Sequence, residues 1–335
     1  MQGSTLKKIR PQRAFGLAGA LKLLLLLAGL GLALFLLMAP GLIGFYWVRV
    51  LTQMLMFATI AQGINIMAGY TGCPVFGNVV FFGIGAYGTA IVMVQHGGPF
   101  ALGVLVGVVA AVLFAVVLGT PLLRLRGHYF AIATLGLNEA SKAIANNLQI
   151  TGGGNGLSLP LPPGSVAENA TFFYYLFLAL AVIGVAIVYA LNASRLGYAC
   201  RAIRANEDTA ACSGIDTTRV KTLVWCISAA LTAVAGGFYA YWMSYVEPLA
   251  VFDMTIAVKA FVIFLIGGVA TPFGPIAGAA VVELLTTFAW SNLLDWHVGF
   301  LGLILILVVL VIPDGLVRTV SDRLLARPAA TDEER

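Results

Sequence analysis

The sequence predicts an all-α polytopic membrane protein with about ten transmembrane helices and one cytoplasmic helix between two of them. Three observations predict this fold class. The 335 residues are 60% hydrophobic and 10% charged, with a mean hydropathy of +0.97, which is more apolar surface than one soluble globule can bury. The apolar residues gather in runs of roughly 20, the length that crosses a bilayer as a helix. Basic residues lie between these runs and fall mostly on one predicted side.

The chain is expected to divide into a cytoplasmic N-terminus (1–19), a transmembrane domain (20–318) and a cytoplasmic tail (319–335). Four basic residues precede the first apolar run, which covers residues 20–39. A cleaved signal peptide is the alternative interpretation. The run is longer than the roughly 7–15 residues typical of a signal peptide, and Ala39-Pro40 is a poor cleavage site. We therefore expect a first membrane helix with its N-terminus inside.

Further apolar runs predict spans at residues 48–68, 79–95, 99–122, 171–191, 221–243, 254–270, 272–291 and 297–313. The segment 128–148 is more polar than these. Counting it as a helix places the 149–170 loop, which has no Lys or Arg, outside, and places most of the 19 basic residues inside. The charge distribution therefore favours a tenth helix at 128–148, with both termini cytoplasmic.

Residues 195–221 form the most charged internal segment, and their basic excess marks them as a cytoplasmic loop. Asn206 can cap a short helix whose first turn carries two carboxylates, and Gly214 can end it. A short exposed helix with small side chains is shaped to seat in a groove of a partner protein. The loop is therefore expected to be a docking element, with candidate residues Arg201, Arg204, Glu207, Asp208, Ala210, Ala211 and Gly214.

The 128–148 helix is the candidate translocation pathway. Polar residues recur in it at helical spacing, and a Glu lies three residues before a Lys, close enough to pair. Charge inside a bilayer is tolerated where it faces protein or a wet cavity. The alternative is a static role, in which the pair and interhelical hydrogen bonds hold the bundle together. The candidate pathway residues are Thr134, Asn138, Glu139, Lys142 and Asn146, with Ser141 on the same polar stripe. For two further in-membrane charges, Lys259 and Glu283, we expect static partners.

Two glycine-rich stretches approach a Phe-Gly pair, one ending at Phe76-Gly77 and the other at Phe273-Gly274. Such stretches either let helices pack closely or break them near a site. Their similarity indicates either a short internal repeat or two ordinary turns. The candidate packing or break residues are Gly69, Gly72, Gly77, Gly267, Gly268 and Gly274.

The sequence offers no catalytic constellation. Its four cysteines show no CxxC pattern, and its three histidines are scattered near predicted membrane boundaries, so we expect no catalytic residues, no metal site and no cofactor bound by this chain. No GxxxxGK[ST] phosphate loop is present, so any ATP must be used by a partner. The formal charge of +5 orients the chain in the bilayer and does not indicate nucleic acid.

Several spaced motifs carry a resemblance to a known family: GYTG (69–72), FFGIGAY (81–87), LRLRGHYFAIATLGLNE (123–139), TGGGNGL (151–157), the 195–221 loop and IGGVATPFGPIAGA (266–279). From about residue 45 to 318 the chain resembles the M-type permease subunits of branched-chain amino acid ABC importers. The resemblance implies a type II ABC importer-like bundle in the cell inner membrane, with the 195–221 loop as the coupling helix. The implied partners are a second related permease subunit, two cytoplasmic ATPase subunits and a periplasmic substrate-binding protein.

The chain departs from the family pattern after GYTG, where Cys73 to Asn78 stand in place of a Ser-Leu-Gly-His type stretch. Leucine, isoleucine and valine are the substrates that the resemblance implies, and urea, short amides or another small acid are alternatives within the same family. An ATP-independent secondary transporter or channel is the alternative from a different class. It would more typically carry several ion-coupling carboxylates in the membrane, where only Glu139 and Glu283 are available.

Overall fold

The computed structural model describes residues 38–125 and 127–292. The chain divides into two units, residues 1–48 and 49–335. In the first unit, residues 38–42 are helical and a long helix begins at Phe45. The second unit holds the rest of that helix and all the elements discussed below.

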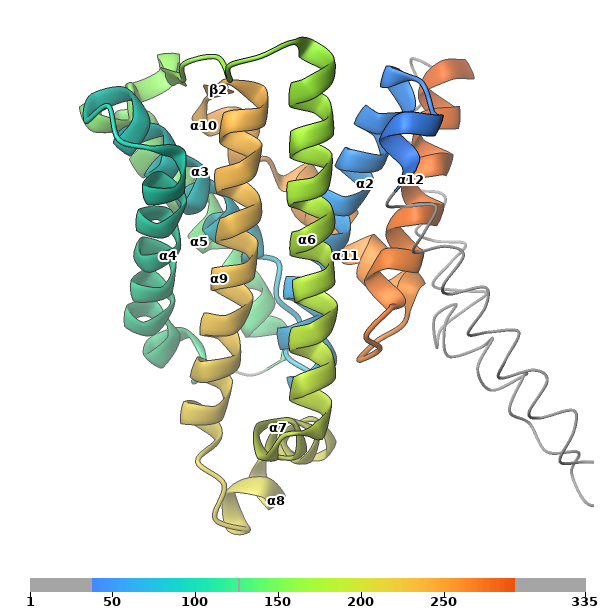
Figure 1. Ribbon diagram of the computed structural model, residues 1–335. Coiled ribbons are helices and arrows are strands. Elements are labelled where there is room, and N and C mark those ends of the chain that lie inside the picture. The colour runs from blue at the N-terminus through green and yellow to red at the C-terminus, as the bar shows by residue number, and fades with distance from the viewer. Residues whose placement is uncertain (1–37, 126, 293–335) are drawn as a thin grey trace, which may run out of the picture. The chain divides into compact units, whose positions relative to one another are not determined.

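The described chain is almost entirely helical (Figure 1). Helix α2 (Phe45–Ile64) continues into a π-helical turn, η1 (Asn65–Gly69). The helices that follow are α3 (Asn78–Gln95), α4 (Phe100–Leu122), α5 (His128–Asn147), α6 (Val166–Ala193), α7 (Arg195–Ala205), α8 (Glu207–Cys212), α9 (Thr217–Met243), α10 (Pro248–Val251), α11 (Met254–Gly267) and α12 (Gly274–Asn292). Between α5 and α6 lie two 3₁₀ turns, Gln149–Thr151 and Gly153–Asn155, and strand β1 (Leu157–Ser158), which pairs antiparallel with β2 (Tyr245–Val246).

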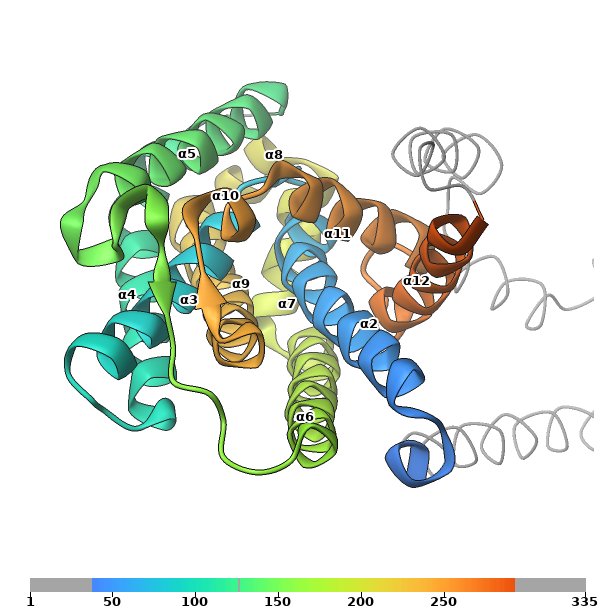
Figure 2. The same cartoon turned by 90° about the horizontal axis from the view of Figure 1, so that it is seen from above.

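Small residues set the packing of α3, α4 and α9, which lie side by side in Figure 2. Helix α4 buries a small residue at every fourth position, Gly103, Gly107, Ala111, Ala115 and Gly119. A Cβ added at Gly107 would lie 2.7 Å from the carbonyl oxygen of Gly85 in α3. Backbone contact through small residues is how helices associate in lipid, where apolar burial alone gives little driving force. The other side of α4 exposes Leu105, Val109 and Leu113, which suit acyl chains.

Each span expected between residues 48 and 291 coincides with a helix, although residues 268–273, expected mostly within two of the spans, form a turn. Within residues 38–125 and 127–292, six segments are long and apolar enough to cross a membrane: Phe45–Gly69, Asn78–Gln95, Phe100–Leu122, Val166–Ala193, Thr217–Met243 and Pro248–Gly267. The chain is therefore an all-α polytopic membrane protein. Helix α5 is not among the six, and α12 offers a shorter apolar stretch, Gly274–Phe288. The spans expected at 20–39 and 297–313, the N-terminus 1–19 and the tail 319–335 lie outside the described residues, so the count of ten stays a prediction.

The two connections that were expected on different sides of the membrane lie at opposite ends of the second unit. Figure 1 shows α7 and α8 at one end, and the α5–α6 connection with the short β1–β2 pair at the other. This connection is tied to α3 by Gln95, whose Nε2 donates to the carbonyl of Ile150 at 2.7 Å. The separation agrees with the predicted topology, whereas the direction of the chain across the membrane stays a prediction.

Candidate functional site

Helix α7 turns away from the end of α6 and crosses beneath it (Figure 1). The turn begins at Ser194, whose hydroxyl accepts a hydrogen bond from the Gly197 amide at 3.1 Å and so caps the new helix. One face of α7 buries Gly197, Cys200 and Ile203, while Tyr198 is exposed. The residue between α7 and α8 is Asn206 alone, which ends the first helix and caps the second.

The short helix expected in the charged loop is present as α8. The Asn206 Oδ1 accepts from the Thr209 amide at 2.9 Å, and Glu207 and Asp208 occupy the first turn, where carboxylates suit the helix dipole. After the helix, Gly214 has a φ of +86° and the Ile215 amide donates to the Ala210 carbonyl at 3.1 Å. This is the left-handed termination that favours glycine. The predicted cap and the predicted end are both confirmed.

Burial divides the candidate docking residues of α8. Ala210 is buried by the chain itself, whereas Asp208, Ala211 and Cys212 are exposed. Of the alanine pair, only Ala211 is open to a partner. The exposed side of α8 therefore carries one carboxylate among small side chains, and we call Asp208, Ala211 and Cys212 the α8 face.

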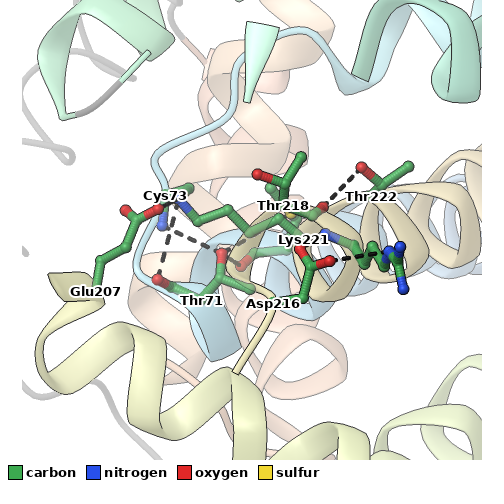
Figure 3. Close-up of polar contacts among 9 residues, drawn as sticks. Thr71, Cys73, Glu207, Asp216, Thr218, Lys221 and Thr222 are labelled. Carbon is green, nitrogen blue, oxygen red and sulfur yellow. Dashed lines mark hydrogen bonds and ion pairs between the residues drawn. The ribbon is translucent and has the colours of Figure 1, made fainter. Parts of the chain in front are cut away.

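A buried ion pair that sequence reasoning missed holds α8 against α9. The Lys221 Nζ lies 2.5 Å from the Glu207 Oε1, with side chains 1% and 24% exposed (Figure 3). A buried ammonium needs a charged partner to offset its lost hydration. From the sequence, Lys221 is only one of the basic residues that mark the 195–221 segment as a cytoplasmic loop. The partners lie 14 positions apart in the sequence, beyond the range of helix-spacing rules, so no local signal could have identified the pair.

The two candidate arginines of α7 have different partners. Arg201 donates to Asn192 at the end of α6, to the Oδ1 at 3.0 Å and to the carbonyl at 3.3 Å, and its guanidinium stacks over the Tyr198 ring. Arg204 instead donates to the carbonyl of Gly69 at 2.6 Å. A Cβ added at Gly72 would lie 3.1 Å from the Arg204 Cγ. Arg201 thus fastens α7 to α6, and Arg204 fastens it to the first glycine-rich stretch.

The two glycine-rich stretches meet inside the second unit. Asn65 in η1 accepts from the Ala270 amide at 2.9 Å and donates to the Thr271 carbonyl at 3.0 Å. Gln62, one turn earlier, donates to the Pro272 carbonyl at 3.1 Å. A Cβ at Gly69 would clash with the Asn65 Oδ1 and lie 3.0 Å from the Ala270 nitrogen, so a glycine there keeps both atoms in place.

Each glycine-rich stretch also connects two helices. Residues 70–77 join η1 to α3, where Gly77 is the N-cap residue, and residues 268–273 join α11 to α12, which begins at Gly274. Gly267 precedes this second turn, in which Gly268 has a φ of +116°. Both stretches therefore interrupt helices. A helix break was one of the two roles expected for them. The internal repeat stays a prediction.

The polar residues of α5 separate into two groups. Thr134, Asn138 and Ser141 are buried. The Thr134 hydroxyl accepts from the Phe76 amide at 3.3 Å, and the Asn138 Nδ2 donates to the Phe252 carbonyl at 2.9 Å. The Asn138 Oδ1 is buried and has no hydrogen-bond partner among the residues that the structure describes. This carbonyl oxygen can accept a hydrogen bond from water or solute.

Glu139 and Lys142 pair as expected, with 3.3 Å between Oε2 and Nζ, but their side chains are 60% and 27% exposed. Asn146 is also exposed. The expected stripe of Thr134, Asn138, Ser141, Lys142 and Asn146 is therefore buried at its first three positions, half-buried at Lys142 and exposed at Asn146. Glu139, expected only as the partner of Lys142, lies off the buried face, because successive helical residues are about 100° apart. The exposed part of α5 carries the charge, and the buried part carries neutral hydrogen-bonding groups.

The remaining in-membrane charges pair with each other. The Lys259 Nζ of α11 lies 2.7 Å from the Glu283 Oε2 of α12, both side chains are largely buried, and the ammonium sits 4.2 Å from the centroid of the Phe57 ring. The static partners expected for them are thus one another. Among residues 38–125 and 127–292, no three His, Cys, Asp or Glu side chains gather in a way that could hold a metal ion.

The fold and these contacts define a class: a multi-pass helical membrane protein in which a capped, charged helical loop is fixed to the ends of several spans. Its family follows from comparison with known proteins. The family model described as "Branched-chain amino acid transport system / permease component" matches residues 46–309. The chain belongs to this family, and the resemblance expected from its motifs is confirmed.

Curated relatives of both permease types match most of the chain. The high-affinity branched-chain amino acid transport system permease protein LivM of Salmonella typhimurium is 30% identical over 299 residues, covering 80% of this chain and 69% of the relative. LivM of Escherichia coli K12 is 28% identical, covering 86% and 73%. LivH of Salmonella typhimurium is 27% identical, covering 78% and 90%. No solved structure matches the chain.

Proposed function

We propose that this chain is a transmembrane permease subunit of an ATP-driven importer of leucine, isoleucine and valine. It lies in the cell inner membrane with the 195–221 loop in the cytoplasm. It pairs with a second related permease, receives solute from a periplasmic binding protein and takes energy from two ATPase subunits that bind the ATP. Membership of the family supports the proposal, because relatives over most of the chain are named as permeases for these amino acids.

The single observation that carries the coupling role is the construction of α8. Its outer side is exposed, while Ala210 and the Glu207–Lys221 pair hold its inner side to the protein. A helix fixed in this way transmits displacement to the spans instead of moving alone. ATP-driven closure of the partners would push on the α8 face and shift the bundle between outward-open and inward-open states.

The pathway is proposed along α5. Buried Thr134 and Asn138 offer neutral hydrogen-bonding groups, and the Asn138 Oδ1 is unpaired among the described residues. Exposed Glu139 and Lys142 offer both charges. Charge within a membrane helix is stable against protein or water but not against lipid, so we expect the second permease or the solute pathway to cover this part of α5.

The first test is uptake of labelled leucine into proteoliposomes that hold this chain with its candidate permease and ATPase partners. The binding protein is supplied on the outward side, and isoleucine, valine, urea and an aromatic acid serve as competitors. Uptake that requires ATP and is blocked by isoleucine or valine supports the proposal. ATP hydrolysis stimulated by loaded binding protein without leucine uptake would refute the substrate, and uptake without ATPase would refute the coupling.

The docking surface has a separate test, because Cys212 lies on the α8 face and is exposed. A membrane-impermeant maleimide is expected to label Cys212 in inside-out vesicles and not in right-side-out vesicles, and bound ATPase subunits are expected to block the labelling. The matched control is Arg219→Cys in a Cys212→Ser background, because the Arg219 side chain is 85% exposed at the same end. Protection of both positions, or of neither, would contradict docking at α8.

A further inference from the structure

A continuous set of hydrogen bonds joins α7 to the turn between α11 and α12. The Arg204 guanidinium donates to the Gly69 carbonyl at the C-terminal end of η1. Four residues earlier in the same π-helical turn, the Asn65 side chain bonds the backbone on both sides of the Ala270–Thr271 peptide. The Tyr70 hydroxyl adds a bond to the Ala270 carbonyl at 3.3 Å. Asn65 and Gly69 are buried, Ala270 and Thr271 are half-buried, and only the Arg204 end of the set is exposed.

The geometry leaves little freedom for these parts to move separately. Gly69 lies directly against the Ala270 nitrogen, and Gly72, with a φ of +74°, lies against the Arg204 stem. All of Asn65–Gly69 is buried. A π-helical turn has wider hydrogen-bond spacing than an α-helix and commonly occurs at functional sites. Carbonyls near a helix C-terminus lack partners within the helix and carry partial negative charge, so a guanidinium there is favourable.

We propose that Arg204 is a positioning residue that couples the orientation of α7 and α8 to the α11–α12 turn by holding the end of η1. Displacement of α8 moves Arg204, the Gly69 carbonyl follows, and the paired bonds of Asn65 carry the shift to residues 270 and 271. This deepens the proposed function, since it names the contact by which a docked partner acts on helices far from it in sequence. Arg201 acts by a different route, because it is bonded to Asn192 and stacked on Tyr198, and both Asn192 and Arg201 interact with the Tyr70 side chain.

The test measures amide hydrogen exchange of the full chain in nanodiscs, which requires neither substrate nor ATPase. Arg204→Ala is expected to speed exchange in the 65–72 and 266–274 segments on the order of tenfold, the effect of losing one charge-assisted hydrogen bond. Arg204→Lys keeps the charge but loses the planar fork and is expected to fall between Arg204→Ala and the wild type. Arg219→Ala is the matched control, because it removes an equal charge at the same end. Unchanged exchange in Arg204→Ala, or an equal change in Arg219→Ala, overturns the proposal.

A double-mutant comparison tests the route. If Arg204 acts through Asn65, Asn65→Ala alone speeds exchange at residues 270 and 271, and adding Arg204→Ala changes it no further. Additive effects would overturn the linkage through Asn65. In the assembled transporter, Arg204→Ala is expected to lower leucine uptake per ATP hydrolysed, and an unaltered ratio counts against the proposal. If the wild-type assembly hydrolyses ATP but carries no leucine, the substrate assignment has failed, and the exchange measurements still decide the linkage.

Discussion

Removing the charge of Glu207 should destabilise the protein more than removing its partner Lys221. Glu207→Gln keeps the shape and one acceptor oxygen but leaves an ammonium that is 1% exposed without a counter-charge. Breaking a buried pair in this way costs about 3–5 kcal/mol. Because the Glu207 side chain is 24% exposed and water can approach the pair, we expect Glu207→Gln to lower the free energy of unfolding by less than this, about 2–3 kcal/mol.

Removing Lys221 instead leaves Glu207, which is partly exposed, without its partner. Lys221→Met removes the buried charge and fills its place with an apolar chain of similar length, and the carboxylate of Glu207 can rehydrate. We expect a loss of about 1 kcal/mol or less, and we expect the double variant Glu207→Gln/Lys221→Met to be more stable than Glu207→Gln alone.

Unfolding of the purified protein in mixed micelles, followed by tryptophan fluorescence, gives the order of stabilities. The control is Arg219→Ala, which breaks an exposed pair with Asp216 and should cost less than about 0.5 kcal/mol. The reasoning is refuted if Glu207→Gln is as stable as this control, or if Lys221→Met is the less stable of the two single variants.

Three further predictions concern single positions. Gly214→Ala should destabilise the protein by about 1–2 kcal/mol, because its φ of +86° disfavours any Cβ although the space around it is open. Gly136→Ala, at a helical position that is equally open, should be neutral or stabilising in the same unfolding assay. Equal losses of stability at both positions would contradict the backbone argument. Gly107→Val should cost about 1–3 kcal/mol, because its Cβ would approach the Gly85 carbonyl to 2.7 Å; a wild-type unfolding midpoint would show that α3 and α4 can separate freely. Burial raises the pKa of the Cys200 thiol to about 11, so only about 1% of it is thiolate at pH 9 and its alkylation rate should keep rising up to about pH 11. The exposed Cys212 should react first. Mass spectrometry of alkylated peptides checks this order, and faster labelling of Cys200 would refute it.

Features that depend on neighbouring residues were predictable from the sequence. The cap at Asn206, the carboxylates after it and the glycine at 214 are local signals, and they gave α8 its start and end correctly. The apolar runs predicted the long helices between residues 48 and 291 for the same reason, because a run of consecutive apolar residues sets the length of a span. Helix α5 is the exception, since it was predicted from the distribution of basic residues.

Features that depend on distant partners were not predictable in this way. The Arg204–Gly69 and Glu207–Lys221 contacts join residues 135 and 14 positions apart, and basic residues in a loop look alike until the fold brings an acceptor near. The glycines signalled close approach, but the Ala270 nitrogen opposite Gly69 is known only from the structure. In α5 the helical spacing of polar residues identified the buried Thr134 and Asn138. The exposure of Glu139 depends on how the helix is rotated about its axis against its neighbours, which the spacing alone does not give.

The single residue between α7 and α8 has a consequence for timing. Asn206 ends one helix and starts the next with one extended backbone conformation (φ −162°, ψ 116°). No flexible linker separates the two helices, so α7 must move as soon as α8 is displaced. With such a connection the displacement of α7 is proportional to that of α8. With a flexible linker, α8 would first move by a threshold distance before α7 followed. Inserting two glycines between Ala205 and Asn206 would introduce that threshold and keep Asn206 as the cap of α8, and it should delay solute release relative to ATP binding.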